Sequence, residues 1–169
     1  NDERLNMIPW ETIDQARIPG SNEILALRKR GHEYSIRTPE TELMNSRVSG
    51  SEEILAESVT SRLTWQSGPH LLIGGLGMGF TLAAALKNTP EDIRITVSEL
   101  IPAVVDWNRQ FLGPLSGNPM DDARVIVKIE DVMMTIQQQQ NMWDGIILDV
   151  DNGPAGLTHR ANDRLYAPK

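Results

Sequence analysis

Cysteine is absent from the 169-residue sequence, which excludes disulfide bonds, thiolate metal sites and a cysteine nucleophile. The sequence also lacks any apolar run of the roughly 18 residues that a membrane-spanning helix needs. Its first residues do not follow the charged, apolar and small-residue order of a secretory signal. From these absences we expect a cytoplasmic protein that has no membrane partner, although the lack of cysteine also suits a periplasmic one.

Basic residues are in the minority, with 16 Lys and Arg against 23 Asp and Glu, and the formal net charge is −7. An acidic protein is a poor non-specific partner for nucleic acid, because phosphate binding depends on Lys and Arg. The same charge is compatible with a small cationic substrate. The three histidines, His32, His70 and His159, are far apart and form no ligand-spaced pair, so we expect no metal site.

The chain divides into three regions by pattern. Residues 1–20 are mostly polar and predict an irregular N-terminal arm that ends at the turn pair Pro19-Gly20. Residues 21–48 contain short strand candidates at 23–28, 32–37 and 42–44, which predict a small antiparallel β-meander. Residues 49–169 then alternate between apolar strands and helices, and predict a Rossmann-like α/β domain.

The strands of this domain are expected at 70–75, 93–99, 123–129 and 143–149. Its helices are expected from a capping box at residue 49 to about residue 65, and then at 79–88, 102–112 and 132–140. Apolar strands that alternate with helices indicate a parallel sheet covered on both faces. Because such sheets normally have further strands, we expect a domain that is incomplete at its C-terminus, or a sheet edge that a partner supplies.

A glycine loop follows the first parallel strand. Gly75, Gly77 and Gly79 form G-x-G-x-G, and Phe80 stands where a dinucleotide fingerprint needs its third glycine. Twenty residues past Gly79 the next strand ends in Glu99, which is placed to accept hydrogen bonds from ribose hydroxyls. The pattern therefore predicts a nucleoside pocket of the S-adenosylmethionine type.

The other two parallel strands also end in acids. Glu130 and Asp131 follow the third strand, where a carboxylate can accept from an adenine amino group, although Asp131 is equally suited to cap the next helix. Asp149 and Asp151 follow the fourth strand. Asp149 is the candidate for binding and deprotonating an amine, whereas Asp151 is a candidate substrate contact or part of an Asx turn.

From about residue 20 to the end, these motifs resemble those of the spermidine synthase family, the polyamine aminopropyltransferases within the S-adenosylmethionine-dependent methyltransferase superfamily. The matching segments are the meander, residues 50–53, residues 73–79, Glu99, residues 130–131 and residues 149–154. The resemblance implies decarboxylated S-adenosylmethionine as donor and a small amine as acceptor. It also implies that Glu99 binds ribose, Asp131 binds adenine and Asp149 activates the amine. Glu53 becomes a candidate substrate contact, and a homodimer is an expectation.

The departures from the family pattern concern the amine half of the pocket. Gly77 stands where the synthases usually carry the aspartate that binds the aminopropyl amine, and the usual D-[ST]-[ST]-D loop is altered at residues 149–152. Three functions therefore stay open. They are aminopropyl transfer to an amine, methyl transfer from intact S-adenosylmethionine, and a non-catalytic nucleoside-binding or dimerising module.

Overall fold

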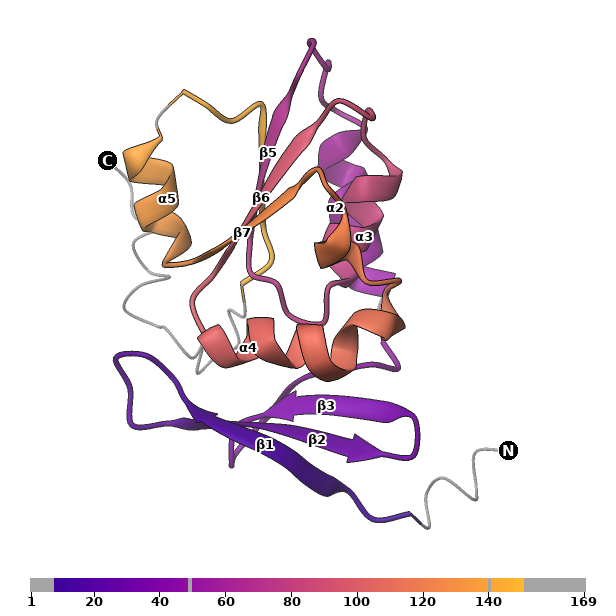
Figure 1. Cartoon of the computed structure of the whole chain (residues 1–169), viewed down its shortest axis with the longest axis vertical. Coiled ribbons are helices and arrows are strands. Elements are labelled where there is room, and N and C mark those ends of the chain that lie inside the picture. The colour runs from indigo at the N-terminus through magenta and orange to yellow at the C-terminus, as the bar shows by residue number, and fades with distance from the viewer. Residues whose placement is uncertain (1–7, 49, 140, 151–169) are drawn as a thin grey trace.

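The computed structural model describes residues 8–48, 50–139 and 141–150, and within them two four-stranded sheets. An antiparallel sheet, built from the first part of the chain, lies across one end of the domain that contains the parallel sheet (Figure 1). Helix α4 lies between the two sheets in this view. No helix in the described ranges is long and apolar enough to cross a membrane.

The antiparallel sheet has the order β1-β2-β3-β4. Its strands are β1 (Glu11–Arg17), β2 (Ile24–Arg30), β3 (Glu33–Arg37) and β4 (Glu42–Asn45). The last three agree with the predicted meander. Residues 11–17 correct the prediction of an irregular arm, since they form β1 and pair with β2. This strand is mostly polar and exposed, so its pairing depends on β2 and leaves little hydrophobic signal in the sequence.

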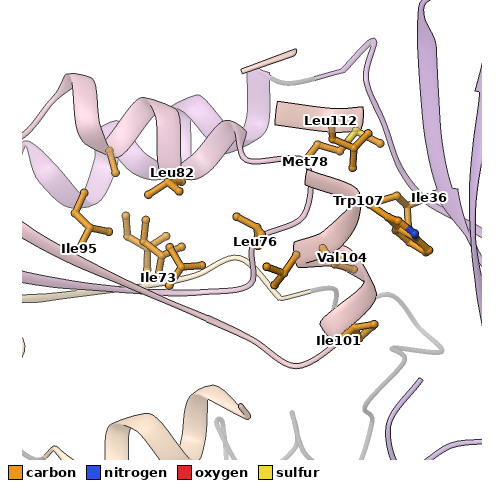
Figure 2. Packing of buried hydrophobic residues seen from close by; sticks show 14 of the residues in the cluster. Ile36, Ile73, Leu76, Met78, Leu82, Ile95, Ile101, Val104, Trp107 and Leu112 are labelled. Atoms are coloured by element: carbon orange, nitrogen blue, oxygen red, sulfur yellow. The ribbon is translucent and has the colours of Figure 1, made fainter. Parts of the chain in front are cut away.

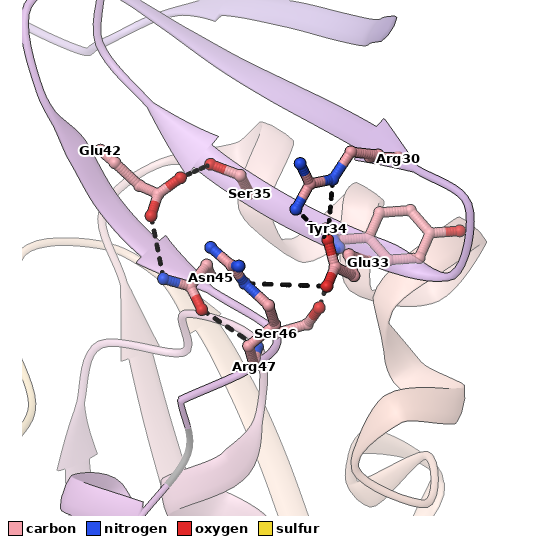
Figure 3. A network of polar contacts seen from close by, with 8 residues as sticks. All are labelled: Arg30, Glu33, Tyr34, Ser35, Glu42, Asn45, Ser46 and Arg47. Atoms are coloured by element: carbon pink, nitrogen blue, oxygen red, sulfur yellow. Dashed lines mark hydrogen bonds and ion pairs between the residues drawn. The ribbon is translucent and has the colours of Figure 1, made fainter. Parts of the chain in front are cut away.

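Polar side chains hold the end of this sheet that leads to β4 (Figure 3). Arg30 donates from Nε and Nη2 to Oε2 of Glu33, at 2.9 and 2.7 Å, and both side chains are largely buried. The Oγ of Ser35 donates to Glu42 across 2.6 Å, and Asn45 donates to the other oxygen of Glu42 across 2.9 Å. These bonds fix β4 and with it the residues that β4 presents to the parallel sheet.

The parallel sheet has the order β7-β6-β5-β8. Its strands are β5 (His70–Gly74), β6 (Arg94–Glu99), β7 (Val125–Ile129) and β8 (Gly145–Leu148). The predicted strands are all found, each shortened by one to three residues. From β5 the chain adds β6 and β7 on one side and then returns to add β8 on the other. The strand order therefore reverses between β5 and β8.

Helices cover both faces of this sheet. They are α2 (Gly50–Thr60), α3 (Phe80–Lys87), α4 (Pro102–Trp107) and α5 (Val132–Gln138). Figure 1 shows α2 and α3 on one side of the sheet and α5 on the other. The predicted helix 102–112 is one α-helix to Trp107, and continues as the π-helix η1 (Asn108–Leu112). Two 3-10 turns follow, η2 (Gly113–Leu115) and η3 (Pro119–Asp121).

One hydrophobic core joins the two sheets. Ile73 and Ile95 of the parallel sheet pack in the same cluster as Leu82 of α3 (Figure 2). The cluster continues through Trp107, which is 1% exposed, to Ile36 of the antiparallel sheet. The indole Nε1 of Trp107 donates across 2.8 Å to Asp14 of β1. Because a buried indole N–H needs an acceptor, this bond ties β1 to α4.

Candidate functional site

The carboxyl ends of the four parallel strands form one edge, at which the predicted site residues gather. The glycine loop follows β5, Glu99 ends β6, Glu130 and Asp131 follow β7, and Asp149 follows β8. Open parallel sheets bind ligands at this edge, in the crevice where the strand order reverses. In this fold the crevice lies between β5 and β8.

A cleft of about 230 Å³ opens at this position. Its walls come from β4, from the start of α2, from the glycine loop with the start of α3, and from the segment after β8. The lining residues are Leu43, Met44, Glu52, Leu76, Gly77, Met78, Phe80, Asp149 and Val150. The two charged residues in this lining, Glu52 and Asp149, are both acidic, and the described lining includes no Lys, Arg or His.

The glycine loop passes directly against the segment after β8. Gly75 has a φ of 95°, and a Cβ placed on it would overlap the carbonyl oxygen of Asp149. Gly77 has a φ of 53°, and a Cβ there would lie 3.2 Å from Sδ of Met44. Gly79 is the N-cap residue of α3. Only a glycine fits at position 75, because both its backbone angle and the space exclude a side chain.

Glu99 is buried behind the loop, with 7% of its surface exposed. Its Oε2 accepts from the backbone N–H of Leu76 at 2.8 Å, and its Oε1 accepts from that of Ile101 at 2.9 Å. Burial raises the pKa of Glu99, and the surrounding backbone amides oppose this effect. The carboxylate thus anchors the glycine loop to the start of α4. Any ribose contact, as predicted from the sequence, has to share these oxygens with the backbone.

Asp149 is positioned by α3. The hydroxyl of Thr81, a residue that is 1% exposed, donates to Oδ2 of Asp149 across 2.5 Å. The backbone N–H of Asp149 continues the ladder with β5 by donating to Gly74 across 2.8 Å. Short hydrogen bonds to a carboxylate are strong ones. Asp149 therefore enters the cleft with a fixed orientation.

Glu130 and Asp131 have defined local partners. Asp131 is the N-cap of α5, and its Oδ1 accepts from the backbone N–H of Met133 at 2.8 Å. Glu130 accepts from the hydroxyl of Thr135 at 2.8 Å, and Lys128 lies 3.6 Å from the same oxygen. Both residues are at the ligand-binding edge of the sheet but outside the lining of the cleft. The capping role that the sequence left open for Asp131 is confirmed.

Of the two candidate substrate contacts, only Glu53 lies among the described residues. Glu53 is exposed on α2 and is not part of the cleft lining, whereas its neighbour Glu52 is. One residue along a helix rotates the side chain by about 100°, which places the two glutamates on different faces. Asp151 lies outside the described residues. Among the described residues, no group of three or more His, Asp or Glu side chains is arranged to hold a metal ion.

Sequence reasoning missed three features of this site. Thr81 carries no recognisable motif, since its role depends on the distance between α3 and the end of β8. Glu52 belongs to the capping-box pattern that marks the start of α2, and its side chain accepts a hydrogen bond from Ser51 Oγ at 2.7 Å. Met44 belongs to the meander, and its position beside Gly77 in the cleft follows only from the fold.

Comparison with known proteins places this geometry in a family. Residues 54–167, more than half of the chain, match the Spermine/spermidine synthase domain. The chain belongs to the spermine/spermidine synthase family. The resemblance inferred from the motifs is thereby confirmed.

Two curated relatives are polyamine aminopropyltransferases. The one from Bacillus subtilis (strain 168) is 32% identical over 88 residues, which are 51% of this chain and 31% of that protein. The one from Ruegeria sp. (strain TM1040) is 33% identical over 79 residues, 47% of this chain and 27% of that protein. The aligned region thus spans less than a third of the length of these relatives.

Solved spermidine synthases have the same fold. The enzyme from Thermotoga maritima superposes with a TM-score of 0.67 at 19% identity, over 82% of this chain and 47% of that one. A spermidine synthase in complex with the transition state analogue AdoDATO superposes with a TM-score of 0.69 at 20% identity, over 86% and 48%. These likenesses confirm the predicted methyltransferase-like sheet preceded by a small antiparallel sheet.

Proposed function

We propose that this protein transfers the aminopropyl group of a decarboxylated S-adenosylmethionine-type donor to an amine acceptor. The observation that carries the proposal is the negative charge of the cleft between β5 and β8, where Glu52 and Asp149 are the charged lining residues. The donor's sulfonium and ammonium groups and the acceptor amine are cationic. A cleft lined by carboxylates favours all three.

In this proposal the residues after β8 carry the chemistry. The carboxylate of Asp149, oriented by Thr81, binds the acceptor amine and takes its proton. The amine nitrogen then attacks the donor carbon bonded to sulfur, so that an N–C bond forms and the C–S bond breaks. The bonding electron pair returns to sulfur and leaves neutral methylthioadenosine. The protein contributes mainly positioning and a proton acceptor.

The nucleoside half of the donor is assigned to the remaining strand ends. Gly75, Gly77 and Gly79 give the backbone room for close approach. Glu99 is proposed to share its oxygens with the ribose hydroxyls, and Asp131 to accept from the adenine amino group with the oxygen opposite its cap bond. The family membership and the order of these residues along the edge of the sheet support this assignment.

Methyl transfer from intact S-adenosylmethionine is the second candidate, favoured by the absence of an acid at Gly77. The cleft argues against it, since the described lining offers no cation for the carboxylate of that donor. The deciding experiment incubates the intact protein with each donor and a panel of diamines and polyamines, and identifies products by mass spectrometry.

We expect aminopropylated amine and methylthioadenosine from the decarboxylated donor, and loss of both in Asp149→Asn. Methylated product from S-adenosylmethionine would instead establish the second candidate. A thermal unfolding series with each donor completes the test. If neither donor yields product and neither raises the midpoint of thermal unfolding, the protein is a non-catalytic module and the proposal is overturned.

A further inference from the structure

At position 77, where the resemblance leads one to expect an anionic group, Met44 crowds the space that a side chain would enter. A Cβ on Gly77 would lie 3.2 Å from Sδ and 3.4 Å from Cε of Met44, which is tighter than an ordinary van der Waals contact to the sulfur. The thioether of Met44 therefore occupies the direction in which a side chain at position 77 would extend. This wall of the cleft is apolar.

A second carboxylate enters the same cleft from another element. Glu52 lies in the first turn of α2 and lines the cleft together with Met44 and Gly77. Its Oε2 accepts from the hydroxyl of Ser51 at 2.7 Å. Asp149, the other lining carboxylate, is bound by Thr81 and is assigned to the attacking amine.

We propose that Glu52 is the specificity-determining carboxylate of this chain, binding the primary ammonium group of the donor's aminopropyl chain in place of an acid at position 77. This inference rests on the proposed function. It divides the two acids by role, with Glu52 on the donor's ammonium and Asp149 on the acceptor. Met44 then packs against the methylene groups between sulfur and ammonium.

With these roles, the cleft should bind decarboxylated S-adenosylmethionine more tightly than intact S-adenosylmethionine. Intact S-adenosylmethionine carries a carboxylate on the carbon that bears its ammonium group. Glu52 would then face a carboxylate as well as an ammonium, and like charges in a partly enclosed cleft repel. Removal of Glu52 should therefore weaken the decarboxylated donor and relieve the penalty on the intact one.

The test compares two ligands by isothermal titration calorimetry with the intact protein. One is decarboxylated S-adenosylmethionine. The other is its analogue in which a methyl group replaces the aminopropyl chain, so that the sulfonium is kept and the ammonium is lost. Glu52→Gln should weaken the first ligand by about tenfold or more, the size expected for one charge-assisted bond, and the second by less than about twofold.

Glu57→Gln is the matched control, because Glu57 is an exposed glutamate on the same helix and outside the cleft lining; it should change neither affinity. Glu52→Asp should recover part of the lost affinity. The inference is overturned if Glu52→Gln leaves the decarboxylated donor unaffected, or weakens both ligands equally. It is also overturned if Glu53→Gln has the predicted effect in its place. If the unsubstituted protein binds neither ligand, the proposed function itself has failed.

Discussion

The hydroxyl of Thr81 in α3 donates a hydrogen bond of 2.5 Å to the carboxylate of Asp149 at the end of β8. Thr81 is buried, so the bond is shielded from water and fixes the side chain of Asp149 relative to the cleft. Thr81 is thus a positioning residue, which acts on the reaction through Asp149.

Thr81→Val should lower kcat by about tenfold while KM for the donor changes little. Valine has nearly the shape of threonine but cannot donate to the carboxylate, and a displaced base costs catalysis more than it costs binding. Steady-state kinetics with the amine acceptor measure both constants. Thr81→Ser is the matched control, since it retains a hydroxyl and should restore most of kcat. Equal losses in both variants would indicate that the methyl group, rather than the hydrogen bond, matters at this position.

Gly75→Ala should destabilise the fold by clearly more than Gly117→Ala. Both glycines have positive φ, 95° and 81°, so each alanine carries a backbone strain of about 1 kcal/mol. At Gly117 nothing lies within 4 Å of the added Cβ, whereas at Gly75 the Cβ would overlap the carbonyl oxygen of Asp149. Urea unfolding of the two variants isolates the cost of the overlap. Similar free energies of unfolding would show that the loop can move away from β8.

Asp131→Ser separates the two roles of Asp131. Serine is a good N-cap, so the free energy of unfolding should change by less than about 1 kcal/mol. Its shorter side chain no longer reaches an adenine amino group, and we expect methylthioadenosine to bind roughly fivefold more weakly. Calorimetry on the variant and the parent protein makes the comparison. Unchanged affinity would leave Asp131 as a helix cap alone.

The sequence predicts those strands whose own residues form an apolar run, and it does not predict a strand that depends on contacts with distant residues. The strands at Leu72 and Val97 were predictable because runs of apolar residues mark a buried parallel sheet. Strand β1 was not, because its polar residues gain order from pairing with β2 and from the bond between Asp14 and Trp107. Such tertiary pairing has no local pattern.

The site shows the same division. The positions of Glu99 and Asp149 at one edge of the sheet were predictable, because each follows an apolar strand and the carboxyl ends of parallel strands share an edge. Placing Glu52 rather than Glu53 in the cleft lining requires the rotational phase of α2 relative to the cleft, which depends on how the helix packs. The anchoring of the glycine loop by Glu99 was equally hidden, since it uses backbone amides of Leu76 and Ile101.

The raised pKa of Glu99 predicts a pH dependence of stability with a definite sign. The folded state keeps the proton to a higher pH than the unfolded state, where the pKa is about 4. Below that value both states are protonated and the group contributes nothing. As the pH rises through it toward the raised value, ionisation favours the unfolded state and stability is lost.

Glu99→Gln lacks this titration. The thermal midpoint of the parent protein minus that of Glu99→Gln should therefore fall as the pH rises above about 4. Differential scanning calorimetry at several pH values gives this difference directly. A difference that grows with pH would mean that the backbone amides outweigh the burial of the carboxylate.

Gly77 and Met44 predict that an acid at position 77 can be accommodated only in combination with a smaller residue at position 44. Aspartate tolerates a φ of 53° better than most residues, but its Cβ would meet the Met44 sulfur at 3.2 Å. Gly77→Asp alone should therefore weaken binding of the decarboxylated donor, because the displaced Met44 intrudes on the cleft. The double variant Gly77→Asp with Met44→Ala should bind it at least as tightly as the parent protein, since a third carboxylate then faces the ammonium group.

Calorimetry on both variants, with Met44→Ala alone as control, distinguishes steric exclusion by Met44 from electrostatic repulsion among the carboxylates. If the double variant binds as weakly as Gly77→Asp, repulsion among the acids limits the cleft, and the absence of an acid at position 77 follows from the presence of Glu52.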